Sequence, residues 1–135
     1  MAGNGLVDAG FVVALLSRRD THHRWVVAQA ARLPPPWKTC EAALSEAFHL
    51  IEPSGTPALG TLLRRRAIAP VFDLGANVDA VVKFIQKYHD VPASLADACL
   101  VRMTETLADP VLLTTDGDFR IYRRHGRLTV PCVTP

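Results

Sequence analysis

The sequence of 135 residues has no long apolar run and few cysteines. Its longest apolar stretch, Phe11 to Leu16, is far too short to cross a bilayer. No basic segment followed by a long apolar core indicates a secretory signal. The three cysteines are widely spaced and include no Cys-x-x-Cys pair, which disfavours a disulfide framework or a zinc site and favours a reducing cytosol. We therefore expect a cytoplasmic protein without a membrane segment.

The sequence also has no strong net charge, no internal repeat and no low-complexity segment. Its formal charge of +2 falls well short of that of a strongly basic nucleic-acid binder, so a nucleic acid would have to meet a local basic patch. The hydrophobic content of 49% is ordinary for a globular protein and excludes a disordered chain. Because the length suits one domain and no linker divides the chain, we expect a single domain over residues 1–135.

Strand patterns and helix patterns alternate along the chain. Strands are expected over 5–8, 37–39, 68–72, 111–114 and 128–130. Helices are expected over 11–17, 22–33, 41–51, 58–66, 78–88, 94–107 and 118–124. Prolines 34–36 end one helix, and Pro70 suits an edge strand because it has no N–H to donate. Such alternation predicts an α/β fold with a mainly parallel sheet covered by helices on both faces.

Four acidic residues stand in apolar or turn-forming segments: Asp8, Glu46, Asp97 and Asp116. Glu46 and Asp97 have apolar neighbours three or four residues away, so both interrupt helix faces that are expected to point to the core. Asp8 and Asp116 come at the ends of predicted strands, at the edge where parallel sheets bind ligands. An unpaired buried carboxylate is costly, so we expect these four acids to meet and share a cation.

Four motifs, in their order along the chain, resemble those of the PIN-domain nucleases, and most closely those of the VapC-type toxins of bacterial toxin–antitoxin pairs. They are Leu6-Val-Asp8-Ala-Gly, Thr39-Cys-Glu-Ala-Ala-Leu-Ser-Glu46-Ala, Leu95-Ala-Asp97-Ala-Cys-Leu-Val and Leu113-Thr114-Thr-Asp116-Gly-Asp118-Phe119. The resemblance covers nearly the whole chain. It implies a PIN-like three-layer α/β/α sandwich with a mainly parallel central sheet.

The resemblance also implies a metal-dependent endoribonuclease that uses Mg²⁺ or Mn²⁺. Its catalytic metal ligands would be Asp8, Glu46, Asp97 and Asp116, with Asp118 as an outer member. Carboxylate oxygens suit these hard cations, which can activate water and neutralise charge at a scissile phosphate. Thr114 matches a hydroxyl position in the family pattern and is expected to hydrogen-bond a ligand carboxylate or metal-bound water.

Each acid also has a purely structural interpretation. Asp8 could cap the helix that follows it, and Asp97 could belong to a capping box. Glu46 could be a surface residue, and the last two acids could form only a turn around Gly117. A capping role does not exclude metal binding.

A basic cluster directly follows the last acids. Arg120, Arg123 and Arg124 are expected to contact RNA, because phosphate contacts position a nucleic-acid backbone. Trp25 and Phe48, at helical spacing, are expected in the core. The resemblance further implies a cognate antitoxin and a homodimer as partners, with apolar surface drawn from the helices around these two aromatic residues.

Two other functions stay open, a catalytically weak PIN-fold module that binds RNA or protein, and a housekeeping nuclease. A phosphohydrolase that forms a phosphoaspartate at Asp8 is disfavoured, because such enzymes need a second acid where this chain has Gly10. Many PIN relatives carry Ser or Asn at that place, so the resemblance is incomplete there.

Overall fold

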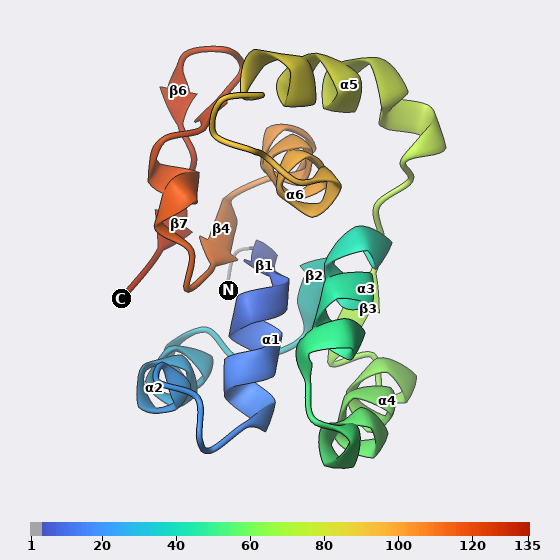
Figure 1. The fold of residues 1–135 in the computed structure, drawn as a ribbon, viewed down its shortest axis with the longest axis vertical. Helices are drawn as coiled ribbons and strands as arrows, with labels where there is room; N and C mark the ends of the chain where they lie inside the picture. The colour runs from blue at the N-terminus through green and yellow to red at the C-terminus, as the bar shows by residue number, and fades with distance from the viewer. Residues whose placement is uncertain (1–3) are drawn as a thin grey trace.

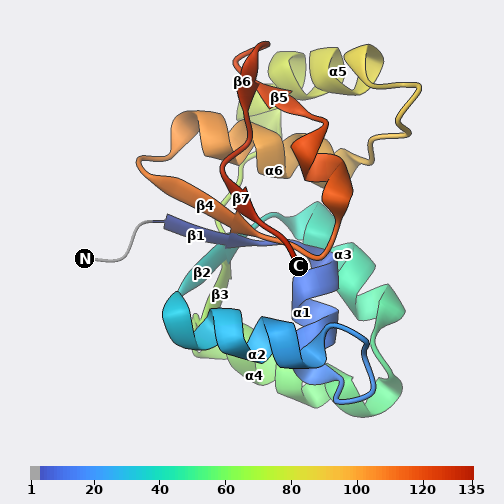
Figure 2. The same cartoon turned by 90° about the vertical axis from the view of Figure 1, so that its left-hand side faces the viewer.

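The computed structural model describes residues 4–135 as a parallel sheet with helices on both of its faces (Figures 1 and 2). The sheet has five strands in the order β3-β2-β1-β4-β7, and each neighbouring pair is parallel. The strands are β1 (Asn4–Val7), β2 (Trp37–Thr39), β3 (Ile68–Pro70), β4 (Pro110–Leu113) and β7 (Cys132–Val133). The predicted α/β fold is confirmed, and Pro70 lies in an edge strand as its missing N–H requires.

The helices fill the segments between the strands. They are α1 (Ala9–Leu16), α2 (His23–Arg32), α3 (Glu41–Leu50), α4 (Thr56–Arg64), α5 (Val78–Lys87) and α6 (Leu95–Thr106), with short 3₁₀ helices η1 (Pro53–Gly55), η2 (Gly75–Asn77) and η3 (Gly117–Arg120). Among the described residues, no helix combines the length and the hydropathy that a bilayer crossing requires.

The two faces of the sheet carry separate apolar clusters, because successive residues of a strand point to opposite sides. Leu6 and Leu112 pack with α5 and α6 on one face. Val7 and Leu113 pack with α1, α2 and α4 on the other face (Figure 2). The three layers of the sandwich follow from this alternation.

Helix α3 lies where the two helical layers meet. It contributes Ala43 to the first cluster and Leu44 to the second, and it contacts both α1 and α6. Helix α3 therefore lies next to one helix from each layer, α1 and α6.

The strand order reverses between β1 and β4, which are neighbours at the centre of the sheet. Val7 pairs with Leu113, so the residues that follow them, Asp8 and Thr114, leave the sheet side by side. In open parallel sheets, ligands bind beyond the carboxyl ends of the strands at such a reversal. The fold thus places two sequence-distant segments at its expected ligand edge.

The end of the chain differs from the sequence prediction. The helix expected over 118–124 stops at Arg120, and Arg123–Arg124 instead forms β5, which pairs antiparallel with β6 (Leu128–Thr129). The turn of this hairpin needs positive φ at His125 (51°) and Gly126 (78°), a conformation that suits glycine. The predicted strand 128–130 therefore belongs to the hairpin. The last strand of the main sheet is β7, which is too short to show a pattern in the sequence.

The aromatic residues expected in the core are only partly there. Phe48 is 40% exposed, so its assignment to the core is wrong. Helix α3 turns Ala43 and Ala47 inward at i and i+4, and the next residue is rotated about 100° away from them. Trp25 is partly buried at the edge of its cluster, where α2 buries Val26 instead.

Candidate active site

Asp8 is the most deeply enclosed acid of the predicted set, with 7% of its surface exposed. It caps α1, and its Oδ1 accepts the Phe11 N–H at 2.9 Å. Its Oδ2 accepts a hydrogen bond from the Thr114 hydroxyl, the contact expected for that threonine. Burial raises the pKa of Asp8 to about 6, and the negative charges of Asp116 and Asp97 add to the rise.

Thr114 joins Asp8 to the segment that follows β4. Its buried hydroxyl also accepts the backbone N–H of Asp116 at 2.9 Å. Asp116 then caps η3, because its Oδ1 accepts the Asp118 N–H at 2.9 Å. The hydroxyl of Thr114 thus hydrogen-bonds both to the segment that follows β1 and to the segment that follows β4.

Asp97 lies in the first turn of α6, within the capping box that its spacing from Ser94 allowed. The Ser94 hydroxyl accepts the Asp97 N–H at 3.0 Å, and Asp97 Oδ2 accepts the Ser94 N–H at 3.4 Å. The same Oδ2 accepts the phenol O–H of Tyr122 at 2.8 Å. Burial raises the pKa of Asp97, and Asp116 contributes to the rise.

Tyr122 is a site residue that sequence reasoning missed. It is fully buried against Phe84 and Tyr88, with ring centroids 5.1 Å away in both cases. Burial and the charge of Asp97 raise the pKa of its phenol, so Tyr122 keeps its proton and remains a donor. Its spacing from Phe119 indicates a core aromatic residue, but nothing in the sequence indicates a partner 25 residues earlier.

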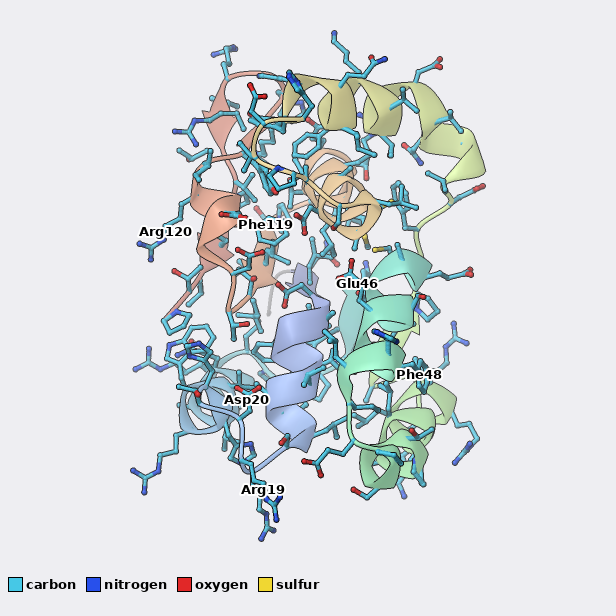
Figure 3. All side chains as sticks on the ribbon, in the orientation of Figure 1. Arg19, Asp20, Glu46, Phe48, Phe119 and Arg120 are labelled. Carbon is cyan, nitrogen blue, oxygen red and sulfur yellow. The ribbon has the colours of Figure 1, made fainter. Side chains whose placement is uncertain are left out.

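Glu46 is exposed, so the expectation that it interrupts a core-facing stripe is wrong. The buried side of α3 is set by Ala43 and Ala47, and Glu46 projects from the helix toward α6 (Figure 3). It still feels the other acids. Partial burial raises the pKa of Glu46, and the charges of Asp97 and Asp116 raise it further.

The structural interpretations of the acids are also observed. Glu46 lies at the surface. Asp8 caps α1, Asp97 is the N3 member of the capping box of α6, and Asp116 accepts the Asp118 N–H in the turn that begins η3. The amino ends of α1, α6 and η3 therefore lie close to these carboxylates, and their partial positive charge offsets some of the repulsion. A carboxylate has about four acceptor positions, so a cap leaves oxygen lone pairs free for a further partner.

The donor set fits a hard cation in chemical type and in charge. All candidate donors are oxygens, and neither ion pair found within residues 4–135 involves the site, because they join His89 to Asp90 and Arg102 to Glu105. The carboxylates do not surround a single point. In the described part of the chain, no three acidic, His or Cys side chains converge closely enough to hold a metal. A cation would have to draw the carboxylates inward.

The three arginines predicted to bind RNA have different surroundings. Arg120 is exposed and points outward from η3, whereas Phe119 beside it points inward (Figure 3). Arg123 donates from Nη1 to the carbonyls of residues 120–122, and Arg124 donates from Nη1 to the carbonyl of Thr104. Two of the three guanidinium groups are thus already engaged by the protein.

The family model of the PIN domain matches residues 5–124, a range that includes all five predicted acids. No curated protein matches the chain.

Proposed function

Because this chain belongs to the PIN-domain family, whose members are generally nucleases and often metal-dependent, we propose that it is a Mg²⁺- or Mn²⁺-dependent endoribonuclease. The supporting observation is that Asp8, Glu46 and Asp97 all lie within the electrostatic influence of Asp116, at the point where the strand order reverses. Burial raises the pKa of Asp8, Glu46 and Asp97, and the charge of Asp116 adds to the rise in each of them. The fold provides the four acids with no ion-pair partner within residues 4–135.

In this proposal the four acids hold the cation, and Asp118 stands outside them. A bound Mg²⁺ or Mn²⁺ would activate water and neutralise charge on the scissile phosphate. Thr114 keeps Asp8 oriented, and Tyr122 holds Oδ2 of Asp97 in place. Arg120, at the rim, is suited to contact a phosphate of the approaching strand.

We also propose that the enzyme is the toxin of a toxin–antitoxin pair in the cytoplasm. A groove of about 730 Å³ is lined by acids, among them Glu46 and Glu41, and by exposed apolar side chains such as Leu95, which is 43% exposed. An antitoxin arm with a basic residue followed by apolar ones would suit this lining. Exposed Phe48 and Leu50 on α3 would suit contact with a second copy of the chain.

A cleavage assay tests the nuclease proposal. With Mn²⁺ or Mg²⁺, the protein should cut a labelled single-stranded RNA, and EDTA should stop the reaction. Asp97→Asn should lower the rate about a hundredfold or more, because the amide cannot serve as an anionic ligand yet can still accept from Tyr122. The matched control is Asp109→Asn, at an exposed position with φ 48° that asparagine tolerates.

The same assay with single-stranded DNA of the same sequence tests whether the protein prefers RNA. Preferential cleavage of RNA is expected. Cleavage that resists EDTA, or an Asp97→Asn variant as active as the wild type, would contradict the proposed metal centre.

A further inference from the structure

Gly10, in the first turn of α1, has almost no room for a side chain. A Cβ atom at this position would lie 2.5 Å from the Thr115 hydroxyl oxygen and 3.7 Å from Asp8 Oδ1. The first distance is far inside an ordinary carbon–oxygen contact of about 3.5 Å. By contrast, a Cβ at Gly55 would meet Ile51 at an ordinary 3.7 Å. The hydroxyl of Thr115 therefore fills a notch that only glycine leaves open.

The notch joins the two segments that carry the central acids. Thr115 stands between Thr114, which donates to Asp8, and Asp116, whose N–H donates to Thr114. Its hydroxyl lies against the turn that Asp8 caps. The Thr115 hydroxyl can thus lie this close to α1 only because position 10 has no Cβ.

Close approach of these segments works against electrostatic repulsion. The charge of Asp116 disfavours ionisation of Asp8, so the two carboxylates would tend to separate. The Thr114 hydrogen bonds pull the loop towards Asp8, and the fit of Thr115 into the notch sets how near it comes.

We propose that Gly10 and Thr115 form a steric lock that sets the spacing of Asp8 and Asp116, which makes Thr115 a positioning residue of the metal centre. The metal part of this inference rests on the proposed function. The lock itself rests on the contact alone, and neither residue supplies a metal ligand.

The first experiment measures thermal stability in EDTA. Replacing glycine by alanine in a helix normally stabilises it. Gly10→Ala should instead lower the Tm, because the new methyl group meets the Thr115 oxygen. Adding Thr115→Ala should restore the Tm to at least that of the Thr115→Ala single variant, whereas adding Thr115→Ser, which keeps the oxygen, should not. Gly55→Ala, the matched control, should leave the Tm unchanged or raised.

The second experiment measures Mn²⁺ affinity by calorimetry. Gly10→Ala should weaken binding about tenfold to a hundredfold, the range seen when groups that support metal ligands are lost. The double variant with Thr115→Ala should recover most of this loss. A Gly10→Ala protein with raised Tm and wild-type Mn²⁺ affinity would overturn the lock, as would a double variant without rescue. A wild-type protein that binds no Mn²⁺ would overturn the proposed metal centre, while the Tm comparison would still decide the lock.

Discussion

Asp8 is held in the protein interior with hydrogen-bond donors around it and with no ion-pair partner among residues 4–135. Its pKa is about 6 in the folded protein and 3.8 in an unperturbed chain. Between these values the folded protein keeps a proton that the unfolded chain has lost. The contribution of Asp8 to the free energy of unfolding of the metal-free protein therefore falls as the pH rises from about 4 to about 6.

We expect this loss to reach about 3 kcal/mol by neutral pH, since each pKa unit corresponds to about 1.4 kcal/mol. Asp8→Asn should remove most of it, because asparagine is an equally good N-cap and can still accept the Phe11 N–H. Urea unfolding in EDTA at several pH values measures the slope. Asp97, whose pKa is also raised, should leave a smaller slope of the same sign. The exposed Asp109→Asn control should keep the full change of unfolding free energy with pH. If Asp8→Asn kept it as well, burial of Asp8 would not be the source of this change.

At the scale of elements, η3 and the β5–β6 hairpin divide the basic cluster into two kinds of arginine. Arg124 anchors the hairpin to α6 through the Thr104 carbonyl, and its Nε is buried without a partner within residues 4–135. Arg120 is exposed beside the acids. The two hairpin arginines therefore hydrogen-bond to the protein itself, and exposed Arg120 on η3 is the arginine suited to the proposed RNA contact.

Arg120→Ala should weaken RNA binding and lower the slope of log K against log salt by about one, as expected for one lost phosphate contact. Its Tm should stay close to that of the wild type. Arg124→Ala should instead destabilise the protein by about 1–3 kcal/mol, because a partly buried charged donor is lost. Fluorescence anisotropy in an Asp97→Asn background, which leaves RNA uncut, measures binding. Arg19→Ala is the matched exposed control, on the loop after α1 (Figure 3). A salt slope unchanged by Arg120→Ala would exclude this contact.

Most helices and strands could be predicted from the sequence, because hydrophobic periodicity and helix-breaking residues are local signals. The three prolines after α2 and the apolar spacing of α5 are such signals. The division of 118–124 into η3 and β5 was not predictable, because a two-residue strand is defined by its partner rather than by its own pattern. The segment has helical spacing, and pairing with β6 overrides it.

The same limit applies to the candidate site. The order of the acids and their places after strands could be predicted from the sequence. The hydrogen bond from Tyr122 to Asp97 and the notch at Gly10 depend on contacts between remote segments. The prediction that Glu46 interrupts a core-facing stripe of α3 was wrong. Alanines form much of the buried face of this helix, and alanine gives a weak amphipathic signal.

For the whole molecule, the toxin proposal predicts an effect on growth. Induced expression of the wild-type chain should arrest growth, because uncontrolled RNA cleavage stops protein synthesis, and Asp97→Asn should be harmless at equal protein level. Co-expression of a small open reading frame next to this gene should restore growth. Colony counts and growth curves measure both effects. Harmless wild-type expression without a neighbouring frame would favour a housekeeping nuclease or a catalytically weak binding module.

The ribosome makes the central strand β1 before the other strands of the sheet, and it makes β4, one of the two neighbours of β1, about a hundred residues later. Pairing over such a separation is slow, since a long stretch of chain must be ordered before the contact forms. Asp8 therefore leaves the ribosome about a hundred residues before the segment that carries Thr114 and Asp116. A growing polypeptide, or a fragment truncated before β4, cannot assemble the acids. The four acids can therefore come together only after β4 and the segment that follows it have been synthesised.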